Sequence, residues 1–381
     1  MSHKHLFSRS LAAAPGRLHF AAHSHHLWPD ASYTGQLSCW DAAARLADRK
    51  WDRIMGEVWP EAQTHVAVEL GADEPSAIVF AVNTHDLLIR LAAACPRAHG
   101  PLRILTTDGE FHSARRQFAR WEESGEAIVT RLPLGPDLVD RLLAVAPAHD
   151  LIFVSQLMFG TGKLFDIAPI AALGRADGPW VVIDGYHSFM GIDRPFPAPL
   201  GDTAFFLGGG YKYAMAGEGV AFMHCPPGFG PRPPVTGWYA EFDELDLPPG
   251  RVGYARDAMR FMGATFDASG LYRFNAAQRM LETEGLTTAT ISAKVAALQE
   301  QLLDALSTTP LADAELLNPL DGQPHARFLA FRKSCAATWC EQLGHEGCIT
   351  DVRGDVLRIG LGLYHDETDV AAFATLAKAL R

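Results

Sequence analysis

The sequence has few cysteines and no long hydrophobic run, and both shortages narrow the kinds of protein it can be. The six cysteines among 381 residues are scattered and form no Cys-x-x-Cys pair. This favours reduced thiols in a cytoplasmic protein over a disulfide framework. No apolar run approaches the roughly 20 residues of a membrane-spanning helix, so we expect no membrane partner. The first residues also lack an apolar stretch, so we expect no signal peptide.

The charge balance lacks a positive excess. The formal net charge is -11 at pH 7, so no nucleic-acid partner is expected. A hydrophobic content of 48% with 20% charged residues is typical of a soluble globular protein. A chain of 381 residues is too long for one small core, which predicts a large and a small domain.

Short apolar runs alternate with helical stretches between residues 77 and 224. Near-continuous apolar strands separated by helices predict an α/β fold with a mostly parallel seven-stranded sheet, covered on both faces. Such sheets bind ligands beyond the carboxyl ends of their strands. The runs are Ala77–Val82, Arg103–Thr107, Ala127–Leu132, Leu151–Ser155, Trp180–Asp184, Thr203–Leu207 and Val220–Met223.

The pattern changes after about residue 270. A long helix over about 271–307 and apolar runs near Ala326–Phe331 and Val356–Leu361 predict a smaller α+β domain. We therefore expect a large domain over 41–268 and a small domain over 269–381. An N-terminal segment, 1–40, is expected to pack with the small domain and the ligand site. The segment Pro226–Pro249 is rich in proline, glycine and aromatic residues and is interpreted as a long excursion.

Two strand ends carry charged residues that together point to one cofactor. Lys212 follows three glycines after the run Thr203–Leu207, and Asp184 ends the run Trp180–Asp184. Pyridoxal phosphate (PLP) needs a lysine that holds its aldehyde as a Schiff base. It also needs an acid that keeps the pyridine nitrogen protonated, so that the ring serves as an electron sink. Either residue alone would be ordinary, but the pair predicts a PLP site.

Other residues suit such a site, although each also has an ordinary structural interpretation. Thr84 is expected to cap a helix whose free N–H groups suit a phosphate. Phe111 would stack on the cofactor ring or belong to the core. His187 would reach the cofactor or be a satisfied core histidine. Arg358 lies inside an apolar strand, where a charge needs a partner: a substrate carboxylate, or an acid of the small domain.

A histidine-rich loop, His23-Ser24-His25-His26, lies near the N-terminus. No carboxylate or cysteine accompanies it at ligand spacing, so we expect no metal site. The favoured hypothesis is a loop that folds over the substrate, with Ser24 and His25 as substrate-binding residues. A solvated polar loop is the alternative.

The chain resembles the PLP-dependent fold-type-I enzymes of the class V aminotransferase group, and within that group it is most similar to kynureninase. The resemblance covers most of the chain. It is carried by Tyr211–Gly217, Gly237-Trp238-Tyr239, Thr350–Arg353 and Leu357–Ile359. It implies a PLP-dependent transferase-like large domain and a homodimer acting on a small amino-acid substrate.

The resemblance also implies roles for individual residues. Lys212 would carry the Schiff base and move the substrate's α-proton, Asp184 would pair with the pyridinium, and Tyr211 would transfer a proton at the leaving carbon. Arg358 would hold the substrate's α-carboxylate. Trp238, and Thr265 in a Gly-Ala-Thr stretch, would reach the phosphate of the neighbouring subunit. The expected cofactor-binding residues are Asn83, Thr84, Phe111, Asp184, His187, Tyr211, Lys212, Trp238 and Thr265.

The chain also departs from the kynureninase pattern. Kynureninases carry an aspartate where Ala114 stands and an Asn-Pro-Pro element in the region of 260–265. The first hypothesis is hydrolytic Cβ–Cγ cleavage of kynurenine or another β-acyl amino acid. Transamination of a different amino acid is the alternative. A cysteine desulfurase or lyase ranks lower, because its nucleophile would be Cys348, which begins a strand. A non-catalytic PLP carrier would not need Lys212, Asp184 and Arg358 together.

Overall fold

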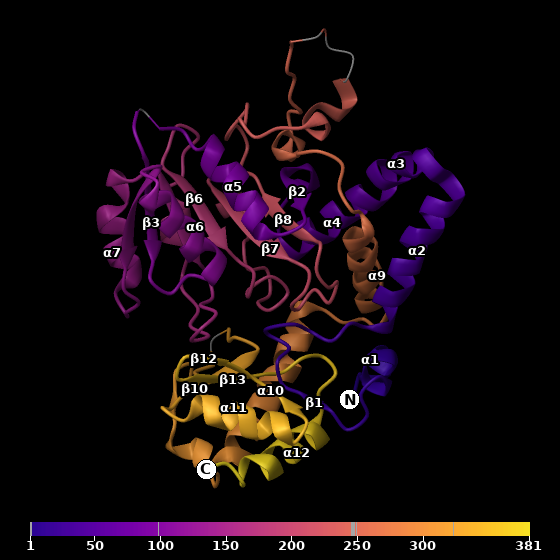
Figure 1. Ribbon diagram of the computed structural model, residues 1–381, viewed down its shortest axis with the longest axis vertical. Coiled ribbons are helices and arrows are strands. Elements are labelled where there is room, and N and C mark those ends of the chain that lie inside the picture. The colour runs from indigo at the N-terminus through magenta and orange to yellow at the C-terminus, as the bar shows by residue number, and fades with distance from the viewer. Residues whose placement is uncertain (1, 98, 245–247, 249, 323) are drawn as a thin grey trace.

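The computed structural model describes residues 2–97, 99–244, 248, 250–322 and 324–381 and has a larger and a smaller part (Figure 1). A seven-stranded sheet forms the centre of the larger part. Strand β8 runs antiparallel to both of its neighbours, and the other six strands run in one direction. In spatial order the strands are β2 (Ile78–Ala81), β8 (Ala221–His224), β7 (Ala204–Gly209), β6 (Trp180–Asp184), β5 (Leu151–Ser155), β3 (Leu102–Thr107) and β4 (Ala127–Leu132).

The prediction of a mostly parallel seven-stranded sheet is confirmed, and each predicted run lies within two residues of an observed strand. Every residue of β7 and β8 is buried, as a strand covered on both faces requires. The covering helices are α5 (Thr84–Ala94), α6 (His112–Glu123), α7 (Leu138–Val145) and α8 (Ala168–Ala171).

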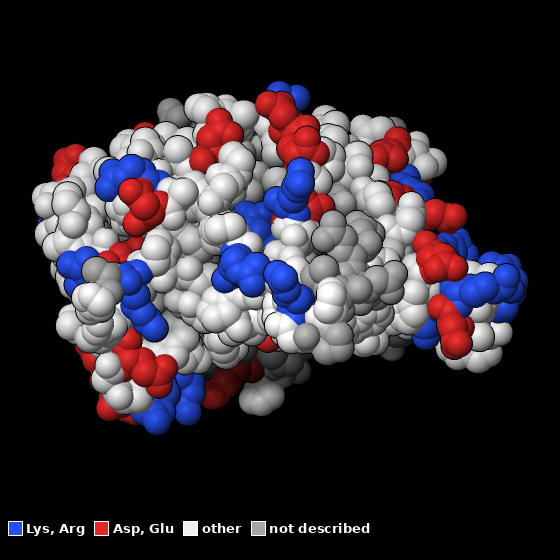
Figure 2. All heavy atoms as spheres, turned by 90° about the horizontal axis from the view of Figure 1, so that it is seen from above, with Lys and Arg blue, Asp and Glu red and all other residues white. Residues whose placement is uncertain are grey.

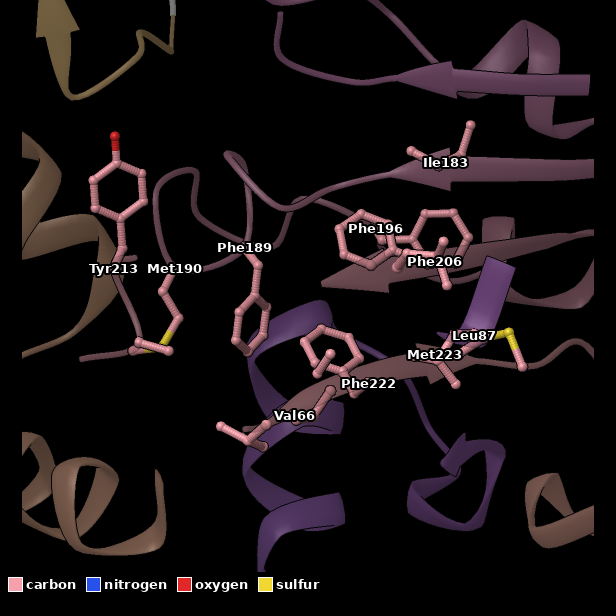
Figure 3. Packing of buried hydrophobic residues seen from close by; sticks show 14 of the residues in the cluster. Val66, Leu87, Ile183, Phe189, Met190, Phe196, Phe206, Tyr213, Phe222 and Met223 are labelled. Carbon is pink, nitrogen blue, oxygen red and sulfur yellow. The ribbon is translucent and has the colours of Figure 1, made fainter. Parts of the chain in front are cut away.

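Aromatic side chains fill the core beside the central strands (Figure 3). The rings of Phe206 and Phe222 stack with their centroids 6.2 Å apart, and Phe189 lies edge-on to Phe222 at 4.6 Å. Burial of one such ring stabilises the fold by about 1.5–3 kcal/mol. The Phe206 ring also explains Gly185, where a Cβ would lie 1.8 Å from the ring, so the turn after β6 requires glycine.

Helices that are far apart in the sequence lie side by side next to the sheet (Figure 1). Helix α2 (Asp30–Leu46) packs along α9 (Ser269–Thr283), and α3 (Lys50–Arg53) and α4 (Trp59–Leu70) follow α2. Gly35 permits the close approach, because a Cβ there would lie 2.6 Å from the carbonyl oxygen of Tyr272.

The prediction of one long helix over 271–307 is wrong. The segment forms α9 and a separate helix, α10 (Thr288–Leu306). Gly285 has a φ of +62°, which interrupts the first helix, and Thr287 caps the second through a reciprocal hydrogen-bond pair with Thr290.

The smaller part is built on a four-stranded antiparallel sheet in the order β12 (Asp351–Arg353), β13 (Val356–Gly360), β10 (Phe328–Arg332), β9 (Glu315–Leu316). It includes α10, α11 (Ala336–His345) and α12 (Glu367–Ala377). The N-terminal segment joins it, because β1 (Leu18–His19), which follows α1 (Ser8–Ala12), pairs in parallel with β11 (Cys348–Ile349).

The described residues include no helix long and apolar enough to cross a membrane. On the face shown in Figure 2, acidic and basic side chains are interspersed rather than gathered into a field of one sign.

Candidate active site

A cavity of about 1260 Å³ lies beyond the carboxyl ends of five strands of the large sheet. Strands β2, β3, β5, β6 and β7 run in one direction, so their ends and the residues that follow them meet at one edge. Seven of the predicted site residues line the cavity together: Asn83, Thr84, Phe111, Asp184, His187, Tyr211 and Lys212.

Lys212 lies at the inner end of the cavity with only 5% of its surface exposed. Its Nζ is 4.6 Å from the ring centroid of Tyr186 and 5.9 Å from that of Phe111. Burial lowers the pKa of Lys212 to about 7, although the negative charge of Asp184 opposes this shift. A substantial fraction of the amine is therefore neutral near pH 7, which is the form that attacks an aldehyde.

Asp184 is fixed on the cavity wall where β6 ends. Its Oδ1 accepts a hydrogen bond from the backbone N–H of Tyr186 at 3.0 Å. Burial raises the pKa of Asp184, and the hydrogen bond and the charge of Lys212 act in the opposite direction. The two predicted residues thus face one cavity as an acid and an amine whose charges stabilise each other.

The beginning of α5 forms another side of the cavity. Asn83, and not Thr84 as the sequence analysis expected, is the N-cap residue. Its backbone is extended and its side-chain oxygen accepts the N–H of Asp86 at 2.9 Å, whereas Thr84 already belongs to the helix. The other N–H groups of this first turn have no partner within the helix, which suits an anion.

Aromatic rings form much of the remaining wall. Phe111 precedes α6 and meets Phe159 edge-on at 5.3 Å between centroids. The rings of Tyr186 and Tyr211 are 4.6 Å apart. Burial raises the pKa of Tyr211 to about 12, so its hydroxyl keeps its proton at neutral pH.

His187 is buried, and its Nδ1 has no hydrogen-bond partner among the described residues. Burial lowers the pKa of His187 well below its usual value, and the charges of Lys212 and Arg358 add to the shift. A buried polar atom without a partner costs about 1–3 kcal/mol, which marks this side of the cavity as a place for a ligand.

Glu110 does not line the cavity but lies directly behind its wall, against the lining residue Ser155, a role that the sequence did not predict. The side chain is fully buried and accepts hydrogen bonds from Thr107 Oγ1 at 2.7 Å and from Ser155 N at 3.2 Å and Oγ at 2.5 Å. Burial raises the pKa of Glu110 to about 7, and these hydrogen bonds limit the shift. An acid just beyond a buried strand is the same signal that identified Asp184.

Arg358 is paired with an acid of the small domain, the second of the two partners that the sequence allowed. Its guanidinium forms an ion pair with Asp351 and donates a hydrogen bond from Nη1 to the carbonyl oxygen of Phe159 at 2.5 Å. The residue is 2% exposed and does not line the cavity itself. Its charge nevertheless acts on Lys212, and its neighbour Phe159 is part of the cavity wall.

The histidine loop contacts the cavity wall at Tyr211 without lining the cavity itself. Ser24 and His25 do not line the cavity. The ring of His25 stacks on Tyr211 at 4.9 Å, while His26 donates its backbone N–H to the Tyr211 carbonyl at 3.1 Å. His23 is the fully buried member and stacks on Phe328 at 4.6 Å. In the part of the chain that the structure describes, no group of three or more His, Cys, Asp or Glu side chains is placed to hold a metal ion.

Trp238 and Thr265 lie outside the cavity wall but next to each other. Trp238 Nε1 donates a hydrogen bond to Thr265 Oγ1 at 3.3 Å, and Trp238 is 40% exposed. Close backbone contact brings the two loops together, because a Cβ on Gly237 would lie 2.4 Å from the carbonyl carbon of Gly263. The two residues therefore form one surface feature.

Residues 42–373 match the family model described as Aminotransferase class-V. Two curated relatives are isopenicillin N epimerases. The protein from Streptomyces clavuligerus is 30% identical over 196 residues, which are 49% of this chain and 48% of that protein. The protein from Amycolatopsis lactamdurans is 27% identical over 209 residues, or 51% and 52% of the two chains. The chain thus spans about half the length of the curated relatives it matches.

Solved structures share the fold over nearly the whole chain. Cysteine desulfurase from Thermococcus onnurineus NA1 has a TM-score of 0.81 at 16% identity and covers 99% of this chain and 98% of its own. A C-DES mutant with glycine covalently linked to its PLP cofactor has a TM-score of 0.81 at 15% identity, with full coverage of both chains. The cysteine desulfurase CsdA from Escherichia coli has a TM-score of 0.79 at 18% identity, covering 98% and 96%.

Proposed function

We propose that this chain, which belongs to the class V aminotransferase family and uses pyridoxal 5'-phosphate, acts on an amino acid at its Cα. The observation that supports this most is the pairing of a buried lysine, whose pKa is lowered to about 7, with an aspartate at the end of the neighbouring strand. A lysine that only formed an ion pair would stay charged, whereas a lysine that attacks an aldehyde must be neutral.

The cavity fits PLP on chemical grounds. It offers an amine for the aldehyde, an acid for the pyridine nitrogen, an aromatic face for the ring and a helix N-terminus for the phosphate. We assign these tasks to Lys212, Asp184, Phe111 and the Asn83–Thr84 turn. Tyr211 would add a hydroxyl donor at the phosphate, and His187 a ring nitrogen that otherwise lacks a partner.

The residues of the chain then share the work at the substrate. When bound, PLP supplies an electron sink for negative charge that develops at Cα. Lys212 takes and returns the proton at Cα, a task suited to an amine with a pKa of about 7 near neutral pH. Asp184 keeps a negative charge beside the ring nitrogen, and Arg358 holds the substrate carboxylate.

Three finer reactions are candidates, and two of them are each favoured by a separate observation. Hydrolytic Cβ–Cγ cleavage of kynurenine or an analogue is favoured by Tyr211, because its hydroxyl keeps a proton to donate to a leaving carbon and its ring centroid lies 5.7 Å from Lys212 Nζ. Epimerisation at Cα is favoured by the two curated relatives, both named as isopenicillin N epimerases. Transamination of another amino acid uses the same residues.

A desulfurase mechanism has less support, although desulfurases share the fold. Cys348 is fully buried in β11 and does not line the cavity, and burial raises its pKa to about 12. A thiol in that environment is neither accessible nor ionised, which are the two properties that a nucleophilic cysteine needs.

We further propose a cytoplasmic homodimer. All six cysteines are free, as expected in a reducing compartment. The dimer is supported by the adjoining surface pair Trp238 and Thr265, which would contact the phosphate bound by the partner subunit.

The test has two stages. The purified protein should absorb visible light, and borohydride should fix the cofactor to the peptide that contains Lys212, with Lys163→Ala as an exposed-lysine control. A protein that binds no PLP would refute the assignment. Kynurenine is then tried first. Alanine plus an aromatic acid formed without a keto acid indicates hydrolysis, a change only at Cα indicates epimerisation, and dependence on a keto acid indicates transamination.

A further inference from the structure

Asp351 is shared by two arginines of the small domain. Its Cα is paired with that of Arg358 across β12 and β13, and its carboxylate forms ion pairs with Arg358 and with Arg353, the latter at 2.7 Å. Side chains alternate between the faces of a strand, so Asp351 and Arg353 share a face of β12. The carboxylate therefore keeps one cation if it loses the other.

Arg358 is only partly satisfied by these contacts. Nη1 donates to the carbonyl oxygen of Phe159 and Nη2 to Asp351, but Nε is buried without a partner among the described residues. A guanidinium binds a carboxylate best through two parallel N–H donors. Asp351 uses one donor of the Nε–Nη2 edge and leaves the other unused, which is unfavourable in a buried site unless a ligand completes it.

The position of Arg358 connects this pair to the cavity. Its guanidinium carbon lies 5.8 Å from the ring centroid of Phe159, which lines the cavity together with Lys212. The charges of Arg358, Asp351 and Arg353 all act on the amine of Lys212. Arg353, by contrast, has a side chain that is 40% exposed. A carboxylate that arrives beside Lys212 would thus meet Arg358 and not Arg353.

We propose that Asp351 is a positioning residue that occupies Arg358 in the absence of substrate and yields it to the substrate's carboxylate while Arg353 retains Asp351. This inference rests on the proposed function. One carboxylate replaces another, so the buried arginine is never left without a negative partner. His23 assists the exchange, because its Nε2 is 3.9 Å from Asp351 Oδ2 and has no hydrogen-bond partner among the described residues.

The exchange makes the site selective for ligands that carry a carboxylate. A ligand without a carboxylate cannot replace Asp351 as the partner of Arg358, so the ion pair between Asp351 and Arg358 stays intact. A ligand with a carboxylate competes directly with Asp351, and its affinity depends on how firmly Arg353 holds the released side chain. Removal of Asp351 and removal of Arg353 should therefore change carboxylate affinity in opposite directions.

The test measures binding of L-alanine and L-alaninol, which lacks the carboxylate, to the PLP-loaded protein by titration calorimetry. Asp351→Asn should raise the affinity for L-alanine roughly tenfold, which corresponds to the free energy of one charged hydrogen bond. It should leave the affinity for L-alaninol unchanged. Arg353→Gln should weaken L-alanine binding by a similar factor. The double variant should bind like Asp351→Asn, and Arg332→Gln, an exposed arginine of β10, should bind like the wild type.

The outcomes separate this role from a purely structural one. Weaker L-alanine binding in both single variants, with additive losses in the double variant, would show that Asp351 only supports Arg358 and would overturn the proposal. The proposal would also be overturned if each substitution changed the affinities for L-alanine and L-alaninol by the same factor. If Asp351→Asn does not fold, the proposal is overturned by an Arg353→Gln variant whose affinity for L-alanine equals that of the wild type. The proposed function fails separately, through the absence of PLP on Lys212.

Discussion

Ser155 donates its hydroxyl hydrogen to Glu110 across 2.5 Å, and the Cα of the same serine is paired with that of Asp184 in the register of β5 and β6. A fully buried acid thus lies one side chain away from the acid assigned to the cofactor. Burial raises the pKa of Glu110 to about 7, and the charge of Asp184 adds to the shift. The proton that Glu110 holds therefore reduces the negative charge beside Asp184.

Glu110→Gln should remove a pH-dependent part of the protein's stability. The pKa of Glu110 is about 7 in the folded state against 4.5 for an ordinary glutamate. Between these values the folded state binds the proton and the unfolded state does not, so stability falls as the pH rises from about 4.5 to 7. The loss is on the order of 3 kcal/mol. Urea unfolding at pH 5, 6, 7 and 8 should show this slope in the wild type and a smaller one in the variant.

Glu123→Gln is the matched control, because Glu123 is an exposed glutamate of the neighbouring helix α6. It should keep the slope of the wild type. Identical slopes in the wild type and Glu110→Gln would contradict the raised pKa.

Asp184→Asn should retain PLP weakly and lose turnover by roughly 100-fold or more, because a neutral amide does not hold the ring nitrogen protonated. Steady-state kinetics and PLP titration provide the measurement. Asp177→Asn, with an exposed aspartate that precedes β6, should behave like the wild type. Near-normal turnover of Asp184→Asn would mean that this aspartate serves the structure alone.

The sequence predicted the large sheet because its central strands are buried on both faces. A residue such as Val182 needs only an apolar environment, which the run Trp180–Asp184 displays directly. The break between α9 and α10 was missed because the apolar spacing continues on both sides of Gly285, although a glycine with a positive φ commonly ends a helix.

The site was predictable where function follows from the end of a strand, as for Lys212 and Asp184. The site was not predictable where a contact forms only after two separate segments of the chain pack together. Asp351 became a partner of Arg358 only through the register of β12 and β13. In the histidine loop, the sequence could not tell that His23 turns inward against Phe328 while His25 stays exposed.

Cys348→Ala should leave turnover close to that of the wild type and lower the free energy of unfolding by about 1 kcal/mol. The thiol is buried in β11 and lies outside the cavity, so its removal affects packing. Activity assays and chemical denaturation test both halves. Loss of a sulfur-releasing activity with stability intact would instead assign Cys348 a nucleophilic role.

Trp238→Ala should weaken dimer formation and PLP retention together, if the tryptophan contacts the partner's cofactor phosphate. Sedimentation velocity and PLP titration across a range of protein concentrations would measure the coupling. Thr265→Val, which removes the hydrogen bond with Trp238, should show a smaller effect of the same sign. Val235→Ala, an exposed residue of the same excursion, is the control. A stable, fully active monomer would rule out the shared site.

Gly217→Ala should loosen the loop that carries Lys212. Gly217 has a φ of +71°, and a Cβ there would lie 2.2 Å from the ring of Trp28 in the N-terminal segment. Gly16 has a similar φ of +80° but open space around it, so Gly16→Ala carries only the backbone cost of about 1–2 kcal/mol. We expect Gly217→Ala to lose more stability than this control, because Trp28 must move, and to bind PLP more weakly. Trp28→Ala in the same chain should recover part of the PLP affinity by relieving the clash. Equal losses in the two glycine variants would show that the contact with Trp28 does not hold the lysine loop.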